Sequence, residues 1–99
     1  MTGEPAFGTV MVARSSATVE DMRALVSTWA EAIGTAAGFL DERCLVTDDG
    51  RVVMCVRFRD RASYEALSDN PEQAAWWEQR MQPLLDGEPQ WIDGAWHDL

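Results

Sequence analysis

Two side chains in this sequence could transfer a proton near neutral pH, Tyr64 and His97. A tyrosine hydroxyl can act as a general acid or donate a hydrogen bond to an enolate, and a histidine imidazole can act as a general base. Each has a structural alternative, because half-buried tyrosines usually bond their hydroxyl locally and His97 lies near Leu99, where a chain can fray. We take Tyr64 and His97 as the candidate catalytic residues.

Tryptophans could line a pocket for an aromatic ligand or pack a core, and four of the five lie in the segment 70–99. Trp77 shares a helical stripe with Met81, so we expect it in the core. Trp76 lies about 100° around that helix and is the better candidate for ligand contact, with stacking on Arg80 as the alternative. Trp29 lies on the apolar stripe of an earlier helix, where it packs on the sheet and could also form part of the pocket wall.

Arg57 is charged at every usable pH and could hold an anionic substrate. Its segment, 39–58, is typical of a hairpin with a turn at 48–50. A two-residue loop places Glu42 opposite Arg57, whereas a three-residue loop places Asp41 there. In either register, a structural ion pair is the alternative to substrate binding.

The cysteines and the single histidine offer little metal or redox chemistry. Cys44 and Cys55 do not form a CxxC motif. Only the two-residue loop would place them opposite each other, where a disulfide could form; the three-residue loop places Cys44 opposite Met54. Because the carboxylates are also scattered, we predict no metal site and no cofactor.

Strand and helix patterns alternate along the segments that position these residues. We predict strands at 7–14, within 39–58 and at 88–99, and helices at 18–38, 60–69 and 70–87, with Thr18 and Gly38 bounding the first helix and Asn70 capping the last. The order β-α-β-β-α-β with an extra short helix predicts one α+β domain over 1–99 with the ferredoxin-like plan. Such a sheet has helices on one face only, yet 7–11 and 52–58 are apolar on both faces. We therefore expect a second copy to cover the other face in a homodimer.

The charge balance restricts the partners. There are 17 acidic residues against 8 basic ones, a net charge of −9, and no lysine. Such a chain repels nucleic acid and anionic membrane surfaces, so we expect neither as a partner. The N-terminal residues lack the basic and long apolar segments of a signal peptide, which predicts a cytoplasmic protein.

The chain resembles the antibiotic biosynthesis monooxygenase family of dimeric α+β barrel proteins. The resemblance rests on the element order and on the segments "AGFL", "GRVVMCVRFRDRASYEAL" and "NPEQAAWWEQRMQPLL". It implies a homodimer with a pocket between sheet and helices in each subunit. Members that oxidise polycyclic phenols without a cofactor deprotonate the substrate to a carbanion that reduces oxygen.

In those members the third strand carries an asparagine and, four residues later, a tryptophan, with a tyrosine on the following helix. This chain has Met54 and Phe58 at the first two places and Tyr64 at the third, so the resemblance implies that all three line the site. Haem-degrading relatives have an axial histidine near the position of Trp76, which cannot bind iron.

We therefore predict a homodimer that binds a small apolar or aromatic ligand and could be a cofactor-free monooxygenase. The alternatives are a cyclase or isomerase of a polyketide-like chain, or a non-enzymatic binding protein.

Overall fold

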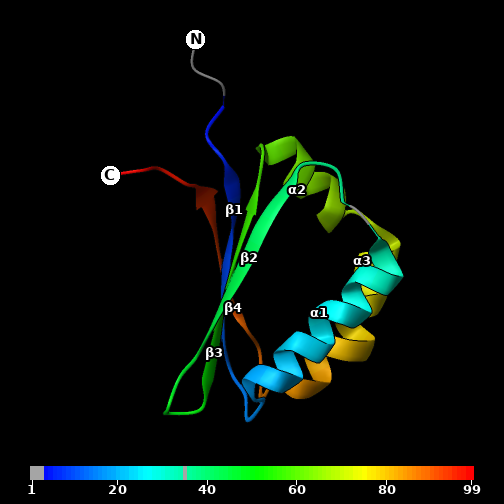
Figure 1. Ribbon diagram of the computed structural model, residues 1–99, viewed down its shortest axis with the longest axis vertical. Coiled ribbons are helices and arrows are strands. Elements are labelled where there is room, and N and C mark those ends of the chain that lie inside the picture. The colour runs from blue at the N-terminus through cyan, green and yellow to red at the C-terminus, as the bar shows by residue number, and fades with distance from the viewer. Residues whose placement is uncertain (1–3, 35) are drawn as a thin grey trace.

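A computed structural model describes residues 4–34 and 36–99 as a four-stranded sheet with helices on one side (Figure 1). The elements are β1 (Phe7–Arg14), α1 (Val19–Ile33), β2 (Phe39–Val46), β3 (Arg51–Phe58), α2 (Arg61–Ser68), α3 (Pro71–Trp76), a π-helical turn (Trp77–Met81), a 3-10 turn (Gln82–Leu84) and β4 (Gln90–Ala95). The predicted α+β order is thus confirmed.

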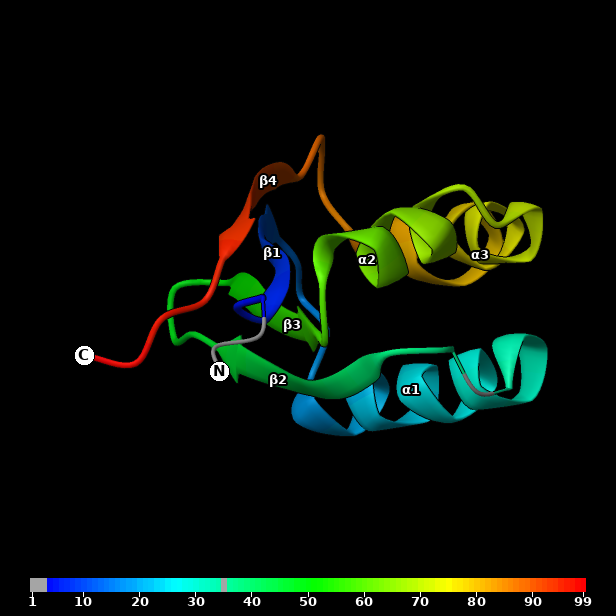
Figure 2. The same cartoon turned by 90° about the horizontal axis from the view of Figure 1, so that it is seen from above.

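The antiparallel sheet has the strand order β2-β3-β1-β4. Viewed from above, α1, α2 and α3 all lie on one side of it (Figure 2). We call this side the covered face and the other side the open face. Since side chains alternate along a strand, each strand contributes to both faces.

The hairpin between β2 and β3 adopts the register of the three-residue loop. Asp41 pairs with Arg57 and Cys44 pairs with Met54, and Gly50 has the positive φ of 82° that this turn requires. The alternative register is wrong, and Cys44 and Cys55 are free thiols.

Helix α1 begins as predicted but ends earlier. Thr18 and Asp21 form a reciprocal capping box, in which the Thr18 hydroxyl accepts from the Asp21 N–H and the Asp21 carboxylate accepts from the Thr18 N–H. The helix ends at Ile33 because Gly34 takes a positive φ of 75° and its N–H bonds to Ala30. The predicted continuation to Gly38 is wrong.

The predicted helix over 70–87 begins with the Asn70 cap but is not continuous. After α3 the backbone widens into the π-helical turn and then tightens into the 3-10 turn that contains Pro83. Proline has no N–H and its ring clashes with the carbonyl four residues earlier, here Gln79 within the π-helical turn. The wider turn accommodates that clash and changes the direction of every side chain after Trp76.

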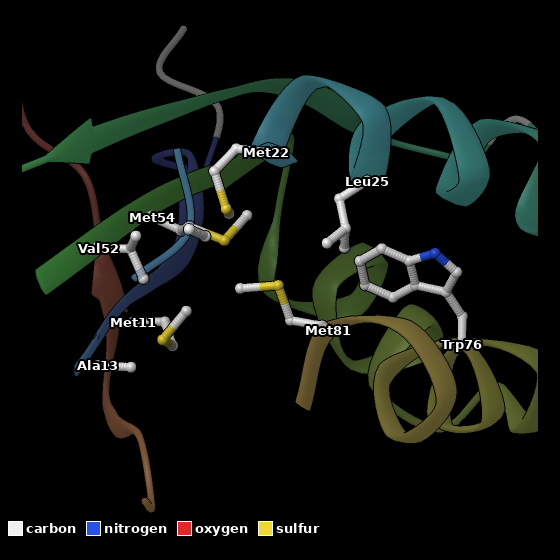
Figure 3. Packing of buried hydrophobic residues seen from close by; sticks show 9 residues of the cluster. Met11, Ala13, Met22, Leu25, Val52, Met54, Trp76 and Met81 are labelled. Carbon is white, nitrogen blue, oxygen red and sulfur yellow. The ribbon is translucent and has the colours of Figure 1, made fainter. Parts of the chain in front are cut away.

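The core lies between the covered face and the helices, and methionines supply much of it. Met11 and Met54 extend from the sheet toward Met22 of α1 and Met81 of the π-helical turn (Figure 3). Met11 and Met81 are almost fully buried. Unbranched thioether side chains adapt to irregular gaps, so this core suits a sheet that meets several short helices at different angles.

Candidate functional site

A cavity of about 380 Å³ lies beside this core, between the covered face and the helices. Its wall is mainly apolar, and every strand and helix contributes to it. Of the residues predicted to contact a ligand or to act in catalysis, the structure brings five to this wall: Trp29, Met54, Phe58, Tyr64 and Trp76.

Aromatic rings form a continuous part of the wall. Trp29 contacts Phe39 at 5.6 Å between ring centroids, and Phe39 in turn contacts Phe58 edge-on at 5.6 Å. Phe58 contacts Tyr64 at 5.7 Å. The series connects α1, β2, β3 and α2, and its tilted and edge-on geometries are the favourable ones for aromatic pairs.

Trp29 and Trp76 both have their indole N–H groups bound to protein acceptors. The indole N–H of Trp29 donates to Gln73 Oε1 at 2.6 Å, and that of Trp76 donates to Thr28 Oγ1 at 3.0 Å. With those donors engaged, the indoles offer the cavity their apolar surfaces.

Trp76 and Trp77 exchange their predicted environments. Trp76 is 9% exposed and belongs to the buried core, whereas Trp77 is half-buried and packs on Trp91 at 5.0 Å. The prediction that Trp77 is the core residue of this pair is wrong: Trp76 is the buried one, and Trp77 packs against the core only in part. The prediction assumed a regular helix through a segment that becomes a π-helical turn at Trp77. Both side chains line the cavity.

Tyr64 has a defined polar partner. Its hydroxyl donates to Asp93 Oδ1 of β4 at 3.1 Å. Burial, and then the negative charge of Asp93, raise the pKa of Tyr64. A tyrosine in this setting is a weak acid, and its oxygen can also accept a hydrogen bond.

Arg57 and His97 lie away from the cavity wall. Arg57 is on the open face, where its guanidinium binds Asp41 with Nη2 to Oδ2 at 2.6 Å. Hydrogen bonds from Arg57 lower the pKa of Asp41. His97 is exposed and follows β4, which ends at Ala95. Arg57 therefore forms the structural ion pair that was the alternative to substrate binding. His97 lies apart from the other candidate catalytic and binding residues.

Glu42 is the wall residue that sequence reasoning missed as a site residue. It pairs with Val56 on the covered face and lines the cavity. Burial raises the pKa of its carboxyl. The hairpin register could have identified Glu42 as a site residue, because only the three-residue loop places Asp41 opposite Arg57 and turns Glu42 toward the helices.

Within residues 4–34 and 36–99, no group of three or more His, Cys, Asp or Glu side chains is arranged to hold a metal ion. No helix in the same ranges is long and apolar enough to cross a membrane.

No family model and no curated protein matches the sequence. Solved structures do match. The monooxygenase from the gene ActVA-Orf6 of Streptomyces coelicolor, in complex with nanaomycin D, is 20% identical with a TM-score of 0.73, over 96% of this chain and 90% of that one. SnoaB, a cofactor-independent oxygenase from Streptomyces nogalater, is 13% identical with a TM-score of 0.70, over 96% and 97%.

The chain has the fold of these oxygenases. A dimeric ferredoxin-like protein of unknown function from Thermobifida fusca also matches, at 9% identity and a TM-score of 0.68 over 97% of this chain and 95% of that one. The ferredoxin-like fold and the resemblance in fold to antibiotic biosynthesis monooxygenases are thereby confirmed. At these identities the likeness concerns the fold and does not extend to the reaction.

Proposed function

We propose that this chain forms a homodimer that binds a small, largely apolar aromatic molecule in the cavity and oxidises it with molecular oxygen without an added cofactor. The observation that carries the proposal is the cavity itself, an aromatic and thioether wall around about 380 Å³. Sites for small molecules commonly enclose about 300 to 1,000 Å³ and combine an apolar wall with a few polar groups.

The polar groups favour a ligand that carries hydroxyl groups. Tyr64 commits its proton to Asp93 and can accept from a ligand hydroxyl, and Glu42 can accept as well. The amide N–H groups of Gln73 can donate, since its oxygen is taken by Trp29. A phenol or enolisable ketone on a polycyclic frame matches this arrangement.

The open face supports the homodimer. By the strand registers, Val10, Val53 and Cys55 lie on it, together with Ile92 at 52% and Leu45 at 64% exposure. An apolar strip of this kind on a small domain is stabilised when a second copy covers it. Sedimentation that shows a stable 11.1 kDa monomer at micromolar concentration would contradict the dimer.

A cyclase or isomerase is the second candidate, and one residue favours it. Met54 stands where the resembled oxygenases have an asparagine, and it lies on the cavity wall. A thioether cannot donate a hydrogen bond to an enolate or to reduced oxygen. The same cavity could then enolise or fold a ligand without consuming oxygen, or bind it without reaction.

A titration of tryptophan emission tests binding, and an oxygen electrode then tests the reaction. We expect saturable quenching by one class among anthrones, quinols and other polycyclic phenols, after correction for inner-filter absorption. Oxygen uptake with that class supports the oxygenase, and product without uptake supports the isomerase. A flat response over the whole panel would contradict the proposed function.

A further inference from the structure

The carboxylate of Glu42 occupies an unusual position for an acidic side chain. Strand alternation turns it from β2 onto the covered face, beside Val56 and at the cavity wall. Other parts of that wall are apolar side chains of α1 and β3, including Leu25 and Met54. A charged group in such surroundings loses hydration that the apolar wall does not replace.

No positive charge compensates Glu42 among the residues that the structure describes. Its side chain has no hydrogen bond and no ion pair there, and no arginine lines the cavity. The adjacent Asp41 is bound at both carboxylate oxygens by Arg57. Asp41 is thus ion-paired on the open face, whereas the neighbouring Glu42 has no charged partner at the cavity among the described residues.

We infer that Glu42 is the general base of this cavity, which takes a proton from an acidic C–H or O–H group of an enolisable aromatic ketone or phenol. The inference rests on the proposed function, since it needs the ligand in the cavity. The C–H or O–H bond breaks, its electron pair stays on the ligand as an enolate or phenolate, and the proton moves to a Glu42 oxygen. Return of the proton to another ligand atom completes an isomerisation, and an oxygenase would use the same anion to reduce molecular oxygen.

Gln73 supplies the group that such an anion needs. Its Oε1 accepts the indole N–H of Trp29 at 2.6 Å, which directs the amide oxygen toward Trp29. The amide nitrogen has no other partner in residues 4–34 and 36–99, and Gln73 lines the cavity. An uncharged N–H donor that is held before the ligand arrives stabilises a developing enolate oxygen.

The elements around the cavity present few groups that titrate. They are Tyr64 from α2 and Glu78 from the π-helical turn, with Cys44 two residues along β2. Neither β3 nor α1 contributes a titratable side chain to the described wall. Desolvation raises the pKa of Glu42, which moves a carboxylate toward the basicity that suits proton abstraction near neutral pH.

Hydrogen exchange of anthrone tests the inference, because its methylene group is a carbon acid and exchange needs no oxygen. In anaerobic D₂O buffer, NMR follows replacement of the methylene hydrogens, and tryptophan emission gives the dissociation constant of anthrone. We expect the wild type to accelerate exchange above the buffer rate, and Glu42→Gln to lower that acceleration about 100- to 10,000-fold while the dissociation constant changes less than about threefold. Glu31→Gln removes an exposed carboxylate of α1 that does not line the cavity, and it should leave exchange within about threefold of wild type.

The outcomes separate the two proposals. If anthrone binds but Glu42→Gln exchanges it as fast as the wild type, or the wild type gives no acceleration, the base assignment is overturned and the proposed binding function stands. If anthrone and the remaining polycyclic phenols do not bind, the proposed function and this inference fall together. Equal losses in Glu42→Gln and Glu31→Gln would also overturn the assignment, because the general negative potential of the protein would then explain the rate.

Discussion

Replacement of Trp76 by alanine should destabilise the fold more than replacement of Trp77. Trp76 is 9% exposed and belongs to the core with Leu25 and Met81, so its truncation opens a large void. Such truncations cost about 3 to 5 kcal/mol of unfolding free energy. The hydrogen bond to Thr28 adds little to this cost, since the Thr28 hydroxyl keeps its own bond to the Leu25 carbonyl at 2.7 Å.

Trp77→Ala is the matched comparison, one residue along the chain. Trp77 is half-buried, and its main specific contact is the tilted ring pair with Trp91 at 5.0 Å. Loss of that pair and of partial burial should cost about 1 to 2 kcal/mol. The two variants should therefore differ by about 1 to 4 kcal/mol in unfolding free energy, with Trp76→Ala the less stable.

Urea unfolding followed by circular dichroism measures this difference, at one protein concentration because a dimer gains stability with concentration. Equal m-values would show that the denatured states are comparable. The reasoning is refuted if Trp77→Ala loses as much stability as Trp76→Ala or more, since the segment from Trp77 would then continue as a regular helix that buries Trp77.

Three further predictions follow from contacts at the sheet. Arg57→Gln should leave the ligand dissociation constant unchanged, because Arg57 binds Asp41 on the open face. A large loss of affinity in the emission titration would contradict this and assign Arg57 to the binding site. Glu42→Gln should raise the free energy of unfolding at pH 7. Burial raises the pKa of the Glu42 carboxyl above its ordinary 4.5, so the wild type loses stability as pH rises from that ordinary pKa through the pKa in the folded state. That gain in urea unfolding should vanish as pH falls below the ordinary value, and a gain that is independent of pH would contradict it. Gly8→Ala should cost at least about 2 kcal/mol, because a Cβ there would overlap the Val56 carbonyl of β3, whereas Gly94→Ala meets nothing and should be nearly neutral; similar urea midpoints for both would refute the overlap.

The starts of two helices and the order of the elements could be predicted, because they depend on local sequence patterns that the structure confirms. The Thr18 capping box and the Asn70 cap fix where two helices begin, and both form as the residue types predict. The ferredoxin-like plan followed from the predicted order of strands and helices, which the structure has. The end of α1 was misplaced because Gly34 and Gly38 both adopt positive φ, and only the first ends the helix.

The candidate site was less predictable because it depends on geometry that a periodic pattern does not contain. A π-helical turn departs from the regular period, so the stripe that joined Trp77 to Met81 gave the wrong buried residue. Glu42 could be assigned to the cavity only after the hairpin register was known, since a shift of one residue moves it to the opposite face. Met54, Phe58 and Tyr64 were found through the family resemblance, and all three reach the wall.

The indole N–H resonances of the tryptophans test the central claim most directly. Four of the five tryptophans, Trp29, Trp76, Trp77 and Trp91, line the cavity, whereas Trp96 does not and lies against Gly8. In a ¹⁵N–¹H spectrum of the protein titrated with anthrone, we expect those four signals to shift together along one saturation curve while the Trp96 signal stays in place. Four unmoved signals, or a shift confined to Trp96, would contradict an aromatic ligand in this cavity.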